Sequence, residues 1–212
     1  MAWAATEDFN GYSDGDLTGE NGGTGWAGAW SGGNEIDVQG TTVYEGAKAV
    51  VQTGASGSTL TRSFTAQISD SSSVNYVALR RSSNSSGVLY YDIRNASDQE
   101  RVRITMNASG NIVANGTTIL AGYSANTWYV LRITLNTSGS SFTVAYSTGA
   151  YGSASSFSAD SAGISMTNTG NLERVVLTTD AVIAISNYWD YISPTTPFVA
   201  ATGDNFLMGA NF

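Results

Sequence analysis

Apolar and polar side chains alternate with a period of two along most of this chain. Such alternation predicts β-strands, because successive side chains of a strand point to opposite faces of a sheet. The most regular stretch is 128–136, where Tyr129, Leu131, Ile133 and Leu135 share one face. Further strands are predicted by the same pattern at 41–52, 58–68, 74–81, 88–94, 101–106, 111–114, 117–120, 142–147, 172–179 and 182–189.

Turn residues separate these runs. Asn115-Gly116 lies between two short β-prone runs and predicts a tight hairpin, because both turn positions need positive φ angles. The strand at 128–136 is followed by a second hairpin signal, and we expect that hairpin in the centre of a sheet. The Ser-, Gly- and Ala-rich stretch 148–171 is predicted to be a long wrapped loop. Its expected anchors are Tyr151, Phe157, Ile164 and Met166.

Length and composition favour one large all-β domain. The chain has 212 residues with 24 Gly and only 2 Pro, which suits strands and turns and leaves little room for helix. We predict a two-sheet antiparallel jelly-roll sandwich over residues 1–193 with negligible helix. Residues 194–212 have no strand periodicity, yet they carry large apolar side chains, and we expect them to form an extended arm. It either folds back on its own sandwich or docks on a neighbouring subunit.

Charge and residue content exclude several function classes. The net charge of −8 argues against a nucleic-acid partner, because phosphate binding needs a basic surface. The chain has no cysteine and no histidine, which excludes disulfides, Cys or His zinc sites and catalysis by imidazole or thiolate. No apolar run approaches 18 residues, so no membrane span is expected. The start, MAWAATEDF, shows no secretory signal, and we expect a protein made inside a cell and used elsewhere.

The opening segment 7–30 is rich in glycine and aromatic residues. It reads EDFNGYSDGDLTGENGGTGWAGAW, so the backbone must turn repeatedly while large side chains stay anchored. One interpretation is a wrapped segment that closes the end of the sandwich. The other makes Trp26 and Trp30 a platform on which a sugar ring stacks. Trp128, Tyr123 and Tyr151 lie near predicted loops and extend this second interpretation.

Two groups of acidic residues are candidates for chemistry. Glu35-Ile36-Asp37 resembles the core motif of laminarinase-like glycoside hydrolases, but that motif continues to a further glutamate, and here Gln39 and Gly40 follow. We therefore predict no catalytic residues. Asp14, Asp16 and Glu20 could ligate calcium through oxygen, but their spacing does not match the twelve-residue calcium loop. No metal and no cofactor are predicted, and a calcium ion near Asp14 and Asp16 stays an open alternative.

The opening segment, the many short strands and the late segment NYWDYI at 187–192 together resemble the concanavalin A-like lectin/glucanase, or laminin-G-like, jelly-roll domains. The resemblance covers residues 7–193. It implies that the first and last strands lie side by side, which would pair Asp8-Phe9 with the region of Asp190. Members of this superfamily include sugar-binding modules, hydrolases and surface or virion domains, so the fold alone does not fix the function.

Two functions follow as hypotheses. The first is a non-enzymatic virion structural protein, such as a phage capsid decoration or fibre component, which assembles with itself or other virion subunits through the sandwich and the C-terminal arm. The alternative is a lectin-like carbohydrate-binding module, or a secreted adhesin or filament subunit, outside the cell or on its surface. In the alternative, Trp26, Trp30 and Trp128 are the predicted glycan-stacking residues.

Overall fold

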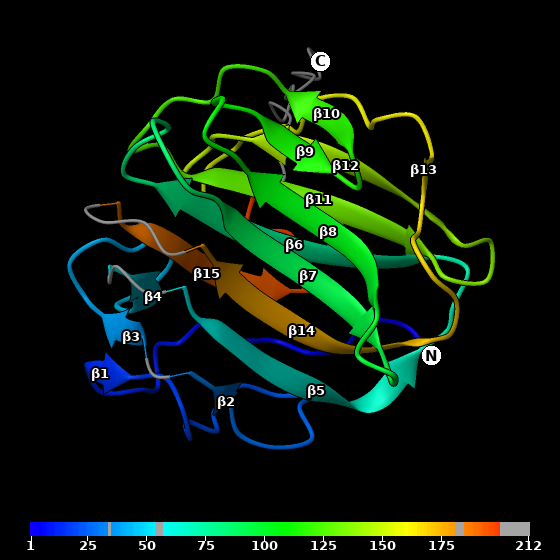
Figure 1. Cartoon of the computed structure of the whole chain (residues 1–212), viewed down its shortest axis with the longest axis horizontal. Coiled ribbons are helices and arrows are strands. Elements are labelled where there is room, and N and C mark those ends of the chain that lie inside the picture. Colours follow the sequence, from blue (N-terminus) through cyan, green and yellow to red (C-terminus); the bar gives the residue numbers. More distant parts are fainter. Residues whose placement is uncertain (34, 54–56, 181–184, 200–212) are drawn as a thin grey trace, which may run out of the picture.

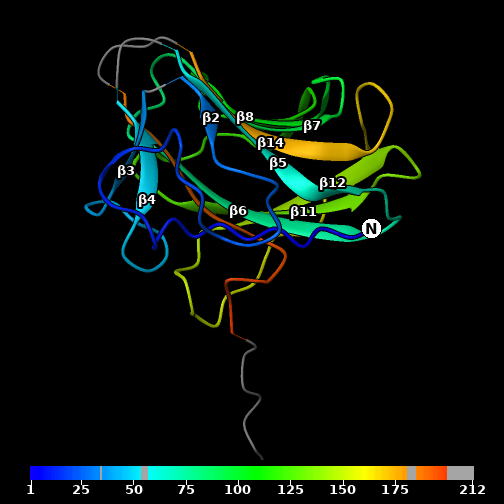
Figure 2. The ribbon, with the colours of Figure 1, turned by 90° about the horizontal axis from the view of Figure 1, so that it is seen from below.

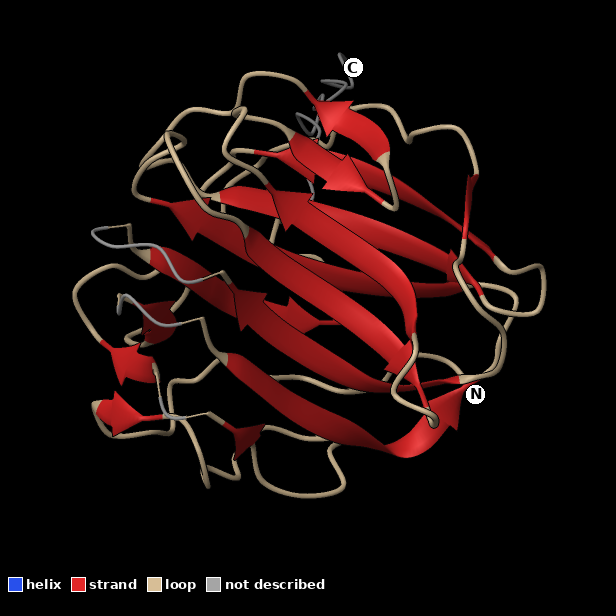
Figure 3. Ribbon diagram, in the orientation of Figure 1, coloured by secondary structure: helices blue, strands red, loops and turns tan. Residues whose placement is uncertain are grey.

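The protein is a sandwich of two antiparallel β-sheets (Figure 1). A computed structural model describes residues 1–33, 35–53, 57–180 and 185–199. These ranges contain strands and loops and no helix (Figure 3), which confirms the predicted all-β class. Accordingly, none of the described segments is a helix long and apolar enough to cross a membrane.

The two sheets are built from strands that are far apart in the chain. The eight-stranded sheet has the order β1 (Gly15–Asp16), β3 (Ile36–Gln39), β4 (Ala49–Gln52), β15 (Asn187–Ser193), β6 (Ser73–Arg81), β11 (Tyr129–Asn136), β12 (Ser141–Ser147) and β13 (Ile164–Ser165). The seven-stranded sheet has the order β10 (Thr117–Leu120), β9 (Ile112–Ala114), β8 (Glu100–Met106), β7 (Leu89–Asn95), β14 (Leu172–Thr179), β5 (Thr59–Ile68) and β2 (Ser31–Gly32).

The core lies between the facing sides of the two sheets. On β11 the side chains of Tyr129, Leu131, Ile133 and Leu135 are all buried there, as their alternation predicts. Each such burial contributes about 1.5–3 kcal/mol relative to an exposed side chain. The strand is flanked by β6 and β12 and so lies inside the sheet. The hairpin that it forms with β12 is not at the centre as predicted, because β12 has only the two-residue edge strand β13 beyond it. The Asn115-Gly116 hairpin is confirmed, with φ angles of 41° and 84°.

The prediction of a strand at 41–52 is wrong for residues 41–48, because only the last four residues form a strand, β4. The backbone before β4 is held by side chains instead of a neighbouring strand. The Asn10 side-chain carbonyl oxygen accepts the N–H groups of Ala47 and Lys48 at 2.6 and 2.9 Å. The Asp190 carboxylate accepts those of Tyr44 and Glu45. Strand β3, which precedes this segment, is too short for its alternation to predict it securely.

The two ends of the described fold meet. Glu7 forms an isolated antiparallel bridge with Ile192, which confirms that the first and last segments of the sandwich lie side by side. After β15, residues 194–199 pass over the outer side of the eight-stranded sheet together with the loop at 148–157 (Figure 2). Phe198 is 8% exposed and its ring packs 5.1 Å from that of Phe157. The start of the predicted arm thus packs on its own domain, and residues 200–212 lie outside the described ranges.

Candidate functional site

The opening segment surrounds a buried arginine. Arg62 on β5 is 1% exposed and forms an ion pair with Glu7, which is equally buried. Its guanidinium carbon lies 5.1 Å from the ring centroid of Trp26 and 5.7 Å from that of Trp30, so both indoles contact the cation through their faces. The Tyr12 hydroxyl donates to Glu7 at 2.7 Å. Burial, followed by the charge of Glu7 and this hydrogen bond, raises the pKa of Tyr12 to about 12. The segment is thus anchored by a closed polar cluster inside the core.

This cluster corrects part of the predicted sugar platform. Trp30 is 1% exposed and packs 6.2 Å from Phe9, so its ring has no free face for a ligand and the stacking prediction is wrong for it. Trp26 is half-buried, stacks on Phe64 and donates its indole N–H to the carbonyl of Thr6 at 2.9 Å. The interpretation of the opening segment as a wrapped segment that closes the end of the sandwich therefore describes both Trp26 and Trp30. Tyr123, which the sugar-stacking interpretation placed at the surface, is also buried, at 2% exposure.

A second aromatic group lies on the outer side of the eight-stranded sheet. We call it the aromatic face and define it by five residues: Tyr44, Trp128, Tyr151, Tyr188 and Tyr191. Ring centroids are 5.9 Å apart for Tyr44 and Trp128, 6.2 Å for Tyr44 and Tyr151, and 5.4 Å for Tyr151 and Tyr191. Tyr151 is 45% exposed, more than any other aromatic side chain among the described residues. The predicted residues Trp128 and Tyr151 thus share one surface.

A β-bulge in β15 gives this face part of its shape. Asp190 lies opposite Ala78 and Ser193 lies opposite Tyr76, so β15 has one residue more than β6 between these pairs. Tyr191 takes a φ of 52° at the bulge. As a result, Trp189 and Ile192 point into the core, whereas Asp190 and Tyr191 both contact groups of the aromatic face. A regular strand would place neighbouring residues on opposite sides of the sheet.

Two cavities border the aromatic face. The larger, which we call the acidic cleft, has a volume of about 450 Å³ and lies between the opening segment and β15. It is lined by Thr6, Glu7, Asp8, Gly11, Gly23, Thr24, Glu45, Tyr151, Tyr191, Ile192 and Ser193. The smaller, of about 270 Å³, is lined by Val43, Tyr44, Thr127, Trp128, Thr148, Gly149 and Ala150. Tyr44 and Ala150 line the smaller cavity, and the residues that follow them in the chain, Glu45 and Tyr151, line the acidic cleft. The two cavities therefore lie on either side of these two chain segments.

The acidic cleft is electronegative. Asp8 and Glu45 are among its lining residues, and no lysine or arginine is. Glu7 also borders it, but the Glu7 carboxylate is buried and paired with Arg62. Burial raises the pKa of Glu45, and the nearby charge of Asp8 raises it further. Burial, together with Glu45 and Asp8, raises the pKa of the Tyr151 hydroxyl as well. Carboxylates accept hydrogen bonds from hydroxyl or amine groups, and an exposed ring can stack on an apolar face, so the cleft suits a polar ligand with ring-shaped units.

The acids singled out in the sequence lie elsewhere. Asp37 on β3 lies opposite Asp16 on β1. Burial raises the pKa of Asp37, and the negative charges of Asp16 and Glu35 raise it further. Neither Glu35 nor Asp37 lines the acidic cleft. Asp14 is ion-paired with Lys48 at 2.5 Å. Among the described residues, no group of three or more histidine, cysteine, aspartate or glutamate side chains is arranged to hold a metal ion.

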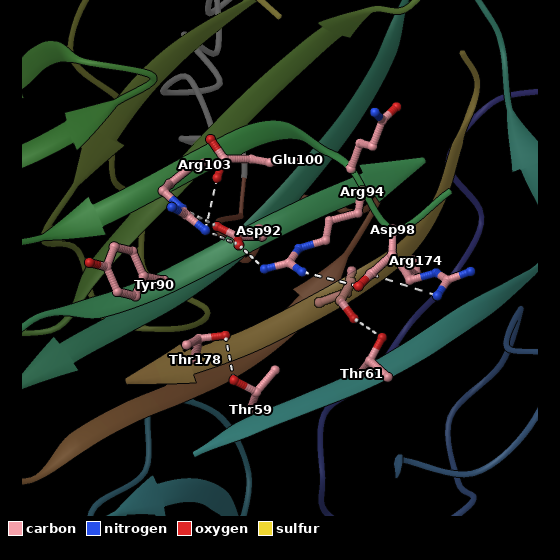
Figure 4. A network of polar contacts seen from close by, with 12 residues as sticks. Thr59, Thr61, Tyr90, Asp92, Arg94, Asp98, Glu100, Arg103, Arg174 and Thr178 are labelled. Carbon is pink, nitrogen blue, oxygen red and sulfur yellow. Dashed lines mark hydrogen bonds and ion pairs between the residues drawn. The ribbon is translucent and has the colours of Figure 1, made fainter. Parts of the chain in front are cut away.

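The outer side of the seven-stranded sheet carries a polar network (Figure 4). The buried Asp92 carboxylate accepts from Arg94 at 2.8 Å and from Arg103 at 2.7 Å, and Arg103 lies over the Tyr90 ring. The remaining charges are also paired, as Arg103 contacts Glu100 and Arg174 contacts Asp98. Because the arginines and carboxylates compensate each other, we assign this network to the stability of the sheet surface.

Solved structures share this fold. A sialidase aligns with 77% of this chain at 13% identity and a TM-score of 0.56, and the aligned part is 16% of the sialidase. The catalytic domain of a GH131 β-glucanase from Podospora anserina aligns over 79% of this chain and 82% of its own, at 13% identity and a TM-score of 0.53. A protein of unknown function from Shewanella oneidensis MR-1 aligns over 92% and 89%, at 14% identity and a TM-score of 0.50.

The chain shares the fold of the sialidase and the glucanase domain, which agrees with the fold that the resemblance to concanavalin A-like lectin/glucanase domains implies. No protein-family model matches the chain, and no curated protein matches it. At these identities the likeness concerns the fold alone, so the site must be argued from its own residues.

Sequence reasoning assigned no ligand role to five residues of the site: Asp8, Tyr44, Glu45, Tyr188 and Tyr191. Tyr44 and Glu45 fell within a predicted strand, and Asp8, Tyr188 and Tyr191 were considered only as parts of the opening and closing segments. Tyr151 was the one cleft residue that the sequence pointed to, as an aromatic side chain in a polar loop.

Proposed function

We propose that this protein is a non-enzymatic carbohydrate-binding domain whose ligand occupies the acidic cleft and extends along the aromatic face. The observation that carries the proposal is the exposed ring of Tyr151 beside a cavity of about 450 Å³. A sugar offers its C–H face to such a ring and its hydroxyl groups to carboxylates such as Asp8 and Glu45. The smaller cavity at Tyr44 and Trp128 gives room for a neighbouring sugar unit.

The test is a glycan array followed by calorimetry with the strongest ligand. Tyr151→Ala should reduce the affinity at least about tenfold, whereas Tyr151→Phe, which keeps the ring, should stay close to the original protein. Tyr90→Ala changes a tyrosine on the opposite side of the sandwich and should leave the affinity unchanged. Absence of any glycan ligand, or loss of binding in Tyr90→Ala but not in Tyr151→Ala, would contradict the proposal. Product analysis after long incubation should show intact ligand, and cleavage would make the protein a hydrolase.

The glucanase and sialidase neighbours support a carbohydrate-related role more than an assembly role. The virion hypothesis gains no support from them and stays a prediction, together with its partners and its arm. A glycan ligand would place the protein where glycans are exposed, outside the cell or on its surface, which is the alternative setting considered from the sequence.

A further inference from the structure

We infer that the acidic cleft selects glycans that carry a protonated amine, such as oligosaccharides of glucosamine, over neutral and carboxylated ones. The inference rests on the proposed function and adds the substrate class. It comes from the combination of negative charge and aromatic rings around one cavity.

The negative charge of the cleft is not compensated locally. Glu7 is neutralised by Arg62, but Asp8 and Glu45 line the same cavity without an arginine or lysine among its lining residues. Asn10 donates to Glu45 at 2.6 Å, and this amide brings no charge. Lys48, the one lysine in the sequence, is paired with Asp14. Residues 1–45, which supply most of the cleft wall, contain no lysine or arginine at all.

The rings around the cleft favour the same ligand. Tyr151 and Tyr191 belong to the cleft, and Tyr44 of the neighbouring smaller cavity packs against both of them. The three ring centroids are 5.4–6.4 Å apart with interplanar angles of 63–88°, so the ring faces are not parallel. The face of an aromatic ring is the negative end of its quadrupole and attracts a cation. Tyr151 and Tyr191 line the cavity together with Asp8 and Glu45. An amine bound there would lie close to these carboxylates and to the exposed ring of Tyr151.

Discrimination follows from what the competing sugars lack. A neutral N-acetyl group cannot form an ion pair with Asp8 or Glu45. Its amide N–H is a weaker hydrogen-bond donor to a carboxylate than a protonated amine. A carboxylated sugar would bring a third negative charge against them, which is a repulsive contact. The ring-stacking contribution of Tyr151 is the same for all three classes. The difference between them therefore reports on charge and not on the existence of the site.

The experiment compares glucosamine, N-acetylglucosamine and galacturonate oligosaccharides of equal length by calorimetry, at a pH where the amine is protonated. The glucosamine ligand should bind at least about tenfold more tightly than the N-acetylated one, and this ratio should fall towards one at high salt. The double variant Asp8→Asn/Glu45→Gln should also reduce the ratio towards one. Asp98→Asn/Asp180→Asn, which removes two acids on other surfaces, should preserve it, and circular dichroism confirms that both variants are folded.

The outcomes separate this inference from the proposed function. If the N-acetylglucosamine oligosaccharide binds as tightly as the glucosamine oligosaccharide or more tightly, and Tyr151→Ala weakens this binding, the charge selectivity is overturned and the glycan site is kept. The same selectivity in both double variants would overturn the role of Asp8 and Glu45. No binding of any of the glycans, on the array or in calorimetry, would remove the proposed function itself.

Discussion

Glu7 and Ile192 exchange both of their backbone hydrogen bonds, at 2.7 Å from Glu7 N to Ile192 O and 2.8 Å from Ile192 N to Glu7 O. The bridge turns the Glu7 side chain into the core and leaves Asp8 exposed in the acidic cleft. Phe9 and Tyr191, close to it, have positive φ angles of 59° and 52°. Each such residue costs about 1–3 kcal/mol unless its surroundings compensate. The contact that closes the sandwich thus also shapes the wall of the cleft.

Replacing Arg62 should destabilise the protein strongly. Arg62→Met leaves the Glu7 carboxylate buried without its cation, and we expect the free energy of unfolding to fall by about 3–5 kcal/mol. Urea denaturation measures this change. Arg132→Met is the matched control, because Arg132 pairs with Asp160 at 29% and 45% side-chain exposure. It should cost no more than about 1 kcal/mol, and similar losses in both variants would contradict the anchoring role of Arg62.

Asp190 should make stability depend on pH. Burial raises its pKa from 3.8 to about 8, although N–H donors from Glu45, Tyr44 and Tyr191 act in the opposite direction. The folded protein holds this proton more tightly than the unfolded chain does. The stability contributed by Asp190 is therefore fully present below its ordinary pKa and is lost as the pH rises through about 8.

The measurement is urea denaturation of the original protein and of Asp190→Asn at a series of pH values across this window. The variant has no ionisable group at this position, so the original protein should lose stability relative to it as the pH rises. Asp160→Asn, at an exposed acid, should run parallel to the original protein. A constant difference between the original protein and Asp190→Asn would show that the carboxyl does not titrate in this range.

Gly23 in the cleft wall should not tolerate a side chain. An added Cβ would lie 2.2 Å from the Thr6 carbonyl oxygen, and the residue has a φ of 66°. Gly116 also has a positive φ, of 84°, but a Cβ there meets nothing within 4 Å. We expect Gly116→Ala to cost about 1–2 kcal/mol from backbone strain alone and Gly23→Ala to cost more. Equal losses in thermal or urea denaturation would mean that the wall yields to the added methyl group.

Phe198 should hold the end of the described chain on its own domain. We expect Phe198→Ala to lower the free energy of unfolding by about 3 kcal/mol, because it removes a buried ring that packs on Phe157. The neighbouring Val199 is 54% exposed, and Val199→Ala should change stability by less than about 0.5 kcal/mol. Denaturation of the two variants gives the comparison, and a neutral Phe198→Ala would indicate that this packing contributes nothing.

Residues that look alike in the sequence have different places in the structure. Trp30 follows Ala29 at the end of the opening segment, and Trp128 follows Thr127 at the start of a predicted strand. Trp30 is enclosed by Arg62, Phe9 and Trp26, whereas Trp128 lies on the outer aromatic face. Exposure depends on what the rest of the chain packs against each ring. A single sequence without its long-range contacts therefore cannot identify which tryptophan is free to contact a ligand.

The sequence by itself determined most of the longer strands, the Asn115-Gly116 hairpin and the all-β sandwich, because alternation and positive-φ turns are properties of a few neighbouring residues. The acidic cleft was decided by the tertiary structure alone. Asp8, Glu45, Tyr151 and Tyr191 come from four separate segments, and the Glu7–Ile192 bridge and the bulge in β15 bring them to one cavity. The extra residue of that bulge turns Asp190 and Tyr191 to the same side, against the alternation that predicted the longer strands.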